Sequence, residues 1–224
     1  MSRQPQSASG RQSHQPASVR AHKATPPAAN KVRIIGGKWR SRVLRFPSRA
    51  TLRPTPDRVR ETLFNWLGQE LHELTTLDLF AGSGALSFES LSRGAAKAVA
   101  VDASRDAVAA LNENAAMLGA AGFEAHCAKA LDFLAADRRG FDVIYVDPPF
   151  DEEWLPQLWP LLEQRINAGG RVYVEQSRPV QPPPGWTLAR HRKAGRVHYH
   201  LLRFEPDLPA GRDTPNLPSQ PNQR

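Results

Sequence analysis

Two hydrophobic periods alternate along the chain from Leu74 onward. Short apolar runs, typical of buried strands, are separated by longer segments in which apolar residues recur every three or four positions, as they do in helices. The predicted strands are residues 74–80, 96–102, 123–128, 141–147, 170–176, 185–193 and 197–204. The predicted helices are residues 84–94, 104–119, 130–137 and 152–166. This alternation predicts an α/β fold, a Rossmann-like, doubly wound and mostly parallel sheet of seven strands.

Two details refine this prediction. The last two strands have no helix between them and should form a C-terminal antiparallel hairpin. The helix at 152–166 contains Pro156 and Pro160, and we expect it to be interrupted or kinked near them because proline lacks an N–H donor.

A different pattern precedes the alternating region. The stretch "VRIIGGKWRSRVLRFP", residues 32–47, predicts a small N-terminal β-hairpin whose two strands flank Gly36 and Gly37. Cationic side chains interleave with apolar ones along it, so one face should be apolar and the other cationic.

The stretch "LRPTPDRVRETLFNWL", residues 52–67, predicts a helix. Thr55 is the expected capping residue, Pro56 the first helical residue, and Asp57 lies in the first turn, where the helix dipole favours an acid. The apolar stripe consists of Val59, Leu63, Trp66 and Leu67. Arg58, Glu61 and Asn65 share another face, which is either solvated or functional.

Composition divides the chain into four parts. Residues 1–31 and 206–224 are rich in Gln, Ser and Pro and poor in large apolar residues, so both are expected to be disordered tails. Between them we expect the hairpin at 32–52 and one folded domain at 53–205. The single cysteine, Cys127, excludes a disulfide framework within the chain.

Charge points to a polyanionic partner. The net charge is +8, and residues 1–60 contain fourteen Lys or Arg but one acid, Asp57. Such a field suits a phosphate backbone. No apolar run reaches the length of a membrane span and no secretory signal is apparent, so we expect a cytoplasmic protein that does not bind membranes. We predict no metal, because His198 and His200 share a strand face without an evident third ligand.

The segment "LDLFAGSGALSFES", residues 77–90, combines a strand, a glycine turn and a helix start. Gly82 and Gly84 permit close approach of a ligand, but Ser87 replaces the third glycine of the dinucleotide fingerprint, which disfavours a pyrophosphate. Asp78 suits a cationic amino-acid group, and Asp102, at the end of the next strand, suits a ribose diol. An adenosine with an amino-acid tail satisfies these features, and the predicted cofactor is S-adenosylmethionine.

The fourth predicted strand of the sheet ends in "DPPF", residues 147–150. The Asp147 carboxylate and the Pro148 carbonyl are two acceptors for an exocyclic amine, Pro149 stiffens the turn, and Phe150 can stack on a base. The predicted reaction is methyl transfer to nitrogen, achieved mainly by positioning.

Together, "RIIGGKWRSRVLRFP", "LRPTPDRVRETLFNWL", "DLFAGSGALSFESLSRGA" and "VDPPF" resemble the RsmD-type 16S ribosomal RNA (guanine-N2)-methyltransferases, within the class I S-adenosylmethionine-dependent methyltransferases. The resemblance covers about residues 32–204 and implies methylation of one guanine N2 in the small ribosomal subunit or its assembly intermediate. The strand-end acid is often Glu in that family, whereas here it is Asp102.

The predicted site residues follow from these motifs. The catalytic set is Asp147, Pro148, Pro149 and Phe150. The cofactor set is Asp78, Ala81, Gly82, Ser83, Gly84, Asp102, Ala103, Ala130, Leu131 and Asp147. The RNA set is Lys38, Trp39, Arg40, Arg42, Arg53, Thr55 and Arg58, although Trp39 suits core packing equally well.

Two alternatives remain open. A DNA methyltransferase acting on adenine N6 or cytosine N4 would use the same motif, but no target-recognition domain follows the catalytic region. A non-catalytic RNA-binding assembly factor would not need the intact acids and glycines. We expect a monomer.

Overall fold

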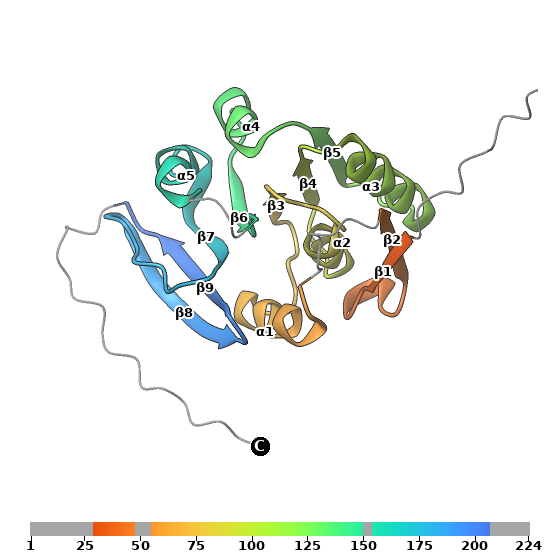
Figure 1. Cartoon of the computed structure of the whole chain (residues 1–224), viewed down its shortest axis with the longest axis horizontal. Helices are drawn as coiled ribbons and strands as arrows, with labels where there is room; N and C mark the ends of the chain where they lie inside the picture. Colours follow the sequence, from red (N-terminus) through yellow and green to blue (C-terminus); the bar gives the residue numbers. More distant parts are fainter. Residues whose placement is uncertain (1–28, 48–54, 150–153, 207–224) are drawn as a thin grey trace, which may run out of the picture.

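One seven-stranded sheet organises the protein (Figure 1). The computed structural model describes residues 29–47, 55–149 and 154–206. The strand order is β5-β4-β3-β6-β7-β9-β8, with β5, β4, β3, β6 and β7 parallel and β9 antiparallel to both of its neighbours. The predicted doubly wound sheet with a C-terminal antiparallel hairpin is therefore confirmed.

The elements of the main sheet run in chain order. The strands are β3 Thr75–Asp78, β4 Lys97–Asp102, β5 Phe123–Cys127, β6 Phe141–Val146, β7 Ile166–Gln176, β8 Trp186–Ala194 and β9 Val197–Phe204. The helices are α1 Asp57–Leu67, α2 Ala85–Ser92, α3 Arg105–Leu118, α4 Ala130–Ala136 and α5 Leu155–Leu162. Ahead of them lie β1 Ala29–Arg33, a 3-10 turn at Gly37–Trp39, and β2 Val43–Pro47.

Side chains along each strand point alternately to the two faces of the sheet, and helices cover both faces. In β4, Val99 and Val101 point into a core that α4 and α5 close, whereas Ala98 and Ala100 point to the opposite face. That opposite face is covered by α1, α2 and α3. Because every β4 side chain from 98 to 101 is buried, the strand reads as a continuous apolar run, as strands of a two-sided parallel sheet do.

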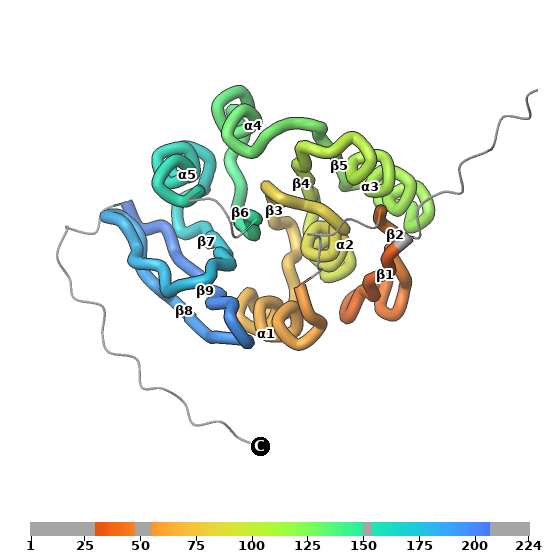
Figure 2. Tube along the Cα trace, in the orientation of Figure 1, coloured from red at the N-terminus to blue at the C-terminus, as the bar shows by residue number. Residues whose placement is uncertain are grey.

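The N-terminal hairpin forms a separate two-stranded sheet that lies beside α3 (Figure 2). Its apolar residues Val32, Ile34, Leu44 and Phe46 are buried against α2 and α3. Asn114 of α3 also pairs with the β2 backbone: its Oδ1 accepts from Arg45 N at 3.1 Å and its Nδ2 donates to Arg45 O at 2.8 Å. The expected separation into apolar and cationic faces is confirmed, because Lys31, Arg33 and Arg45 are exposed.

The two strands of the hairpin flank Gly36 and Gly37, as predicted. Residues 34–42 form the connection between them, and β1 begins at Ala29, before the expected boundary. Gly37 has a φ of +70°, and an added Cβ would lie 1.8 Å from the Ser92 carbonyl oxygen. Gly37 therefore allows the connection to approach α2 closely.

Two helix predictions also change. Thr55 does not cap α1, whose N-cap is Pro56 and which lacks a side-chain cap. The helix around Pro156 is shorter than expected and ends at Leu162, but it continues through Pro160. Pro156 lies in the first turn, where its missing N–H has no helical partner to lose. No helix among the described residues is long and apolar enough to cross a membrane.

Candidate active site at the strand ends

The predicted acids gather where the strand order reverses. The chain passes from β3 outward to β4 and β5 and then returns to β6 on the other side of β3. Asp78 is the last residue of β3, Asp102 the last of β4, and Asp147 follows β6 directly. Ligands of open α/β sheets bind at this carboxyl edge and at such a switch point.

Asp78 is a buried carboxylate with few compensating groups. Ser87 Oγ donates to its Oδ2 at 2.9 Å. Burial, together with the nearby Asp102 carboxylate, raises the pKa of Asp78 to about 7 despite this hydrogen bond. A cation placed beside Asp78 would therefore stabilise its ionised form.

The predicted glycine turn lies between β3 and α2. Backbone conformation requires both of its glycines, and packing also requires one of them. Gly82 and Gly84 have φ values of 48° and 75°, a region that L-residues rarely adopt. At Gly84 an added Cβ would also lie 2.4 Å from Leu111 Cδ2, so this glycine lets α2 pack against α3.

Asp102 holds two loops together. Its Oδ2 accepts from Gly82 N at 2.9 Å, and its Oδ1 accepts from Ser104 N at 2.8 Å. The carboxylate thus links the glycine turn to the start of α3. No local sequence pattern indicated this structural role, and the predicted contact with a ribose stays a prediction.

Asp147 belongs to a buried acidic pair that the sequence analysis missed. Thr55 Oγ1 donates to Asp147 Oδ2 at 3.4 Å and also bonds to Glu175, which lies one strand away on β7. Glu175 is 4% exposed, and Tyr173 Oη donates to its Oε1 at 2.7 Å. The hydroxyl that was expected to cap α1 therefore bridges two carboxyl groups.

Burial sets the protonation of this pair. Asp147 keeps partial exposure, yet burial of its carboxyl group raises its pKa well above the usual range, and the charges of Glu175 and Asp78 add to this. Burial also raises the pKa of Glu175, against its bonds from Tyr173 and Thr55. Because the Thr55 hydroxyl has a single hydrogen, it can donate to only one carboxyl group, so the arrangement favours one shared proton on the pair.

We call Asp78, Asp147 and Glu175 the acidic centre. Among the described residues, no Lys or Arg forms an ion pair with any of the three. Glu175 had one signal in the sequence: it is the acid near the end of the strand that follows the "DPPF" motif.

The other predicted residues lie around this edge, and two fall outside the description. Ala81 and Ser83 are buried in the glycine turn, Ala103 is exposed after β4, and Ala130 and Leu131 open α4 after β5. Pro148 is buried and Pro149 is exposed. Phe150 and Arg53 lie outside the described residues.

The predicted RNA-contacting side chains lie mostly on the surface. Lys38, Arg40, Arg42 and Arg58 are exposed. Trp39 is half-buried, packs against the core on the α1–α2 side, and has Lys38 Nζ 4.3 Å from its ring centroid. The core-packing interpretation of Trp39 is thus supported, and its contact with RNA stays a prediction.

A second buried charged group anchors the hairpin connection. Glu89 of α2 accepts from Arg93 Nε at 2.9 Å and from Ile35 N at 2.8 Å, and lies 3.5 Å from Arg60 Nη1. Arg60 is fully buried and also donates to Arg33 O at 2.8 Å. We call Arg60, Glu89 and Arg93 the arginine–glutamate cluster.

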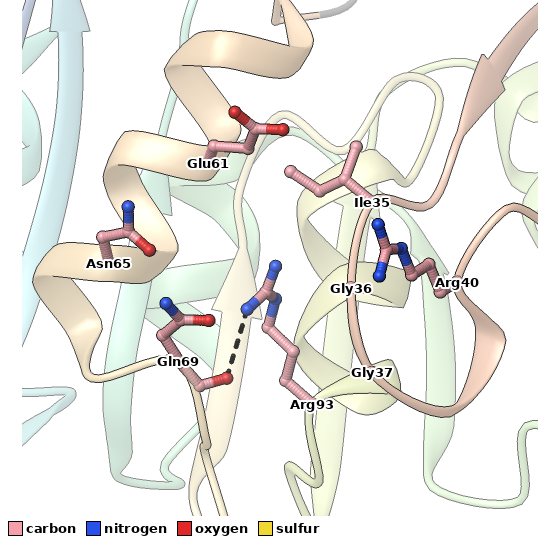
Figure 3. Close-up of a pocket in the computed structure, with 8 residues that line it drawn as sticks. All are labelled: Ile35, Gly36, Gly37, Arg40, Glu61, Asn65, Gln69 and Arg93. Carbon is pink, nitrogen blue, oxygen red and sulfur yellow. Dashed lines mark hydrogen bonds between the residues drawn. The ribbon is translucent and has the colours of Figure 1, made fainter.

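A hollow of about 390 Å³ opens beside this cluster (Figure 3). Figure 3 shows Arg93 between α1 and the hairpin connection, where Nη1 donates to Gln69 O at 3.3 Å. Glu61 and Asn65, from the predicted polar face of α1, line the hollow on one side. The hollow lies along α1 toward Gln69, at the opposite end of α2 from the glycine turn, so it is separate from the strand-end site.

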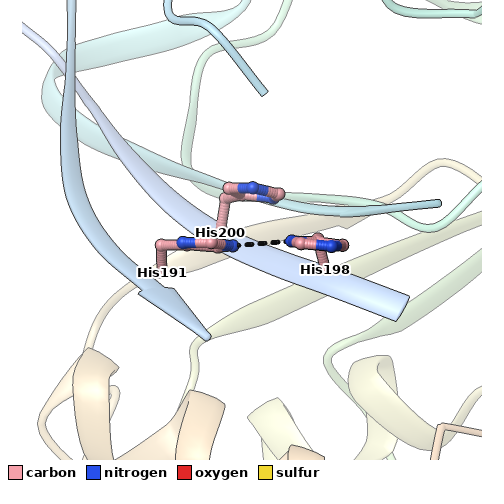
Figure 4. A group of neighbouring side chains, drawn as sticks. All are labelled: His191, His198 and His200. Carbon is pink, nitrogen blue, oxygen red and sulfur yellow. Dashed lines mark hydrogen bonds between the residues drawn. The ribbon is translucent and has the colours of Figure 1, made fainter. Parts of the chain in front are cut away.

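A third histidine joins the two found in the sequence (Figure 4). His191 of β8 lies opposite His200 of β9, and its Nε2 is 3.0 Å from His198 Nδ1. The expectation that a third ring is lacking was wrong, because strand pairing supplied it. The buried His200 already accepts from Val180 N at 3.1 Å and lies 3.3 Å from Val174 O. Both of its ring nitrogens are thus engaged, and metal binding stays untested.

Comparisons with known proteins identify the family of the chain. Residues 32–203 match the family model described as Conserved hypothetical protein 95. The chain is 40% identical over 182 residues to ribosomal RNA small subunit methyltransferase D of Escherichia coli K12, covering 79% of this chain and 92% of that one. It is 39% identical over 187 residues to the protein of the same name from Haemophilus influenzae, covering 80% and 97%. The solved structure of the putative methyltransferase yhhF from Escherichia coli is also similar, with a TM-score of 0.72, 40% identity and coverage of 79% and 99%.

Proposed function

Since the chain belongs to the family described as Conserved hypothetical protein 95, together with the small-subunit ribosomal RNA methyltransferases D, we propose that it methylates the exocyclic N2 of a guanine in 16S ribosomal RNA. The methyl donor is S-adenosylmethionine. The observation that carries the proposal is the acidic centre at the switch point, where Asp147 and the Pro148 carbonyl follow β6 directly.

The residues at the edge fit this cofactor. Asp78 is buried, has no cationic partner among the described residues, and has a pKa above its usual value. It therefore suits the ammonium group of an amino-acid moiety. The glycine turn carries no phosphate-binding lysine, which suits a ligand without phosphate. Asp102 and the first turn of α4 lie at the ends of the two neighbouring strands, where the nucleoside would bind. When bound, S-adenosylmethionine supplies an electrophilic methyl group.

The chain's own residues hold the target amine. Asp147 and the Pro148 carbonyl accept its two N–H groups and so direct the nitrogen lone pair toward the methyl group. As the new N–C bond forms and the bond between the methyl group and its sulfonium sulfur breaks, the amine becomes acidic and gives up one proton. The Asp147–Glu175 pair, bridged by Thr55, accepts that proton within the buried site.

A labelling experiment tests the proposal. The protein is incubated with methyl-labelled cofactor and either unmodified 30S subunits, naked 16S rRNA or DNA, and the products are digested to nucleosides. We expect label in N2-methylguanosine. Label confined to DNA adenine or cytosine would contradict the proposal and favour a DNA methyltransferase. Cofactor binding without transfer to any of the three substrates would favour an RNA-binding assembly factor.

A further inference from the structure

The β8–β9 hairpin carries a cationic tip that the proposed chemistry does not use. We define the tip as residues 190–196, which contain Arg190, Arg192, Lys193 and Arg196. From residue 176 to residue 204 the sequence has six Lys or Arg and no acid. The local field of this hairpin is therefore positive without internal compensation.

Strand register places the tip at the edge of the active site. Val146 pairs with Val174, and Glu175 pairs with Tyr199, which in turn pairs with Arg192. One row across four neighbouring strands thus contains Asp147, Glu175, Tyr199 and Arg192. At about 4.8 Å per strand, Arg192 lies roughly 14 Å from the catalytic motif. Lys193 and Arg196 come after this row and extend beyond the carboxyl edge of the sheet.

The tip lies next to α1 (Figure 2), where Tyr199 stacks on Trp66 with ring centroids 5.3 Å apart. This packing fixes the direction of the hairpin on the face of the sheet that carries Asp147 and Glu175. A rigid support matters because a cation on a fixed strand loses less entropy when it binds than one on a free tail.

The cationic side chains of the tip are available to bind an anionic partner. In the part of the chain that the structure describes, Arg192, Lys193 and Arg196 are exposed and form no ion pair. By contrast, the exposed Arg33 pairs with Asp57 at 3.2 Å, and the exposed Arg203 pairs with Glu205 at 3.4 Å. A tip with several free cations is costly in self-repulsion unless a polyanion approaches it.

We propose that the β8–β9 tip binds backbone phosphates of the RNA next to the target guanine, an inference that rests on the proposed function. RNA is favoured over an anionic membrane because the tip shares the edge at which the target base must enter. The tip also presents no large exposed apolar side chain for insertion into a lipid interface. The tip would thus hold the RNA that flanks the target base on one side of the pocket, while Asp147 recognises the base.

Two matched double variants test the proposal. Lys193→Gln/Arg196→Gln removes two cations from the tip. Lys97→Gln/Arg138→Gln removes the same charge from the opposite edge of the sheet, where Lys97 begins β4 and Arg138 precedes β6. All four side chains are exposed, and cofactor affinity and thermal unfolding report whether each variant is folded.

The readouts are the Kd for unmodified 30S subunits, the KM and kcat of methyl transfer, and the dependence of Kd on salt. For the tip variant we expect Kd and KM to rise on the order of tenfold, the slope of log Kd against log salt to fall by about 2, and kcat to stay within about twofold. The opposite-edge variant should match the wild type.

The outcomes separate the two proposals. If the wild type methylates the subunit and both variants have the same KM and salt slope, the tip inference is overturned while the proposed function stands. If the wild type methylates no RNA, the proposed function fails and the inference fails with it. Loss of binding to phosphatidylserine vesicles in the tip variant, with an unchanged Kd for subunits, would assign the tip to a membrane and overturn the RNA inference.

Discussion

The acidic centre and the arginine–glutamate cluster are both buried, but they differ in charge compensation. Glu89 lies between Arg60 and Arg93, and the backbone N–H of Ile35 supplies a further donor. Asp78, Asp147 and Glu175 have hydroxyl and backbone donors but no cationic partner among the described residues. A buried charge without a countercharge is expensive, so its persistence points to a use outside the folding of the chain.

The two groups of buried charges differ in where their countercharges come from. The arginine–glutamate cluster joins α1, α2 and the hairpin connection, so its charges are satisfied within the protein. The acidic centre lies at a strand-end edge, where a cationic ligand and an amine would supply what is missing.

Asp147→Asn should reduce kcat for methyl transfer by about 10²–10⁴-fold, because it removes the carboxylate that orients the amine and accepts its proton. Cofactor affinity should change by no more than a few-fold, and the free energy of unfolding should not fall. Single-turnover labelling and urea unfolding measure these effects, with the exposed Glu113→Gln on α3 as the control. A large loss of cofactor affinity would mean that Asp147 acts at the other end of the site.

A Glu→Gln substitution should affect stability differently in the arginine–glutamate cluster and in the acidic centre. Glu89→Gln removes the anion beside Arg93 and one of the two acids beside the buried Arg60, the other being Asp57 at 2.7 Å, and should lower the free energy of unfolding by about 3 kcal/mol. Glu175→Gln removes an uncompensated buried acid and should leave stability unchanged or higher at pH 8. Urea unfolding of both variants under one set of conditions measures the difference. Equal losses would show that the acidic centre is as important for folding as the arginine–glutamate cluster.

The acidic centre should also make stability depend on pH. The folded pKa of Asp78 is about 7, whereas its usual value is 3.8, so the folded state holds the proton longer than the unfolded state. Stability is therefore lost as pH rises from about 4 to 7, with a slope of up to about 1.4 kcal/mol per pH unit from this group. Asp78→Asn should flatten the curve in this window. An unchanged slope would show that Asp78 does not retain its proton on folding.

Thr55→Val should reduce kcat by about five- to tenfold, because losing one bridging hydrogen bond costs about 1 kcal/mol. Thr55→Ser keeps the hydroxyl and should restore the rate. If the valine variant instead lost stability without losing rate, Thr55 would be a helix-entry residue as the sequence first suggested. Matched pH–rate profiles of the two variants would show whether the hydroxyl influences the titration of the pair.

Local patterns predicted much of this architecture. The apolar runs and helical periods between Leu74 and Phe204 gave the order and type of the elements, because a two-sided parallel sheet buries whole strands and leaves long apolar runs. The glycine turn and the strand-end acids also follow from sequence, since parallel strands bring their carboxyl ends to one edge. Boundaries were less well predicted, as the helix at 155–162 and the hairpin connection show.

Side-chain partners depended on contacts between distant segments. Thr55 resembles a helix cap in sequence, but its hydroxyl bonds to Asp147, ninety-two residues away. Glu175, His191 and Arg60 each acquire their neighbours from strand pairing or helix packing, and these depend on register across the sheet. The fold class, the strand-end edge and the acids Asp78, Asp102 and Asp147 at that edge followed from local sequence patterns. Which buried charges are compensated followed from the packing of distant segments, because compensation depends on distances that no local pattern encodes.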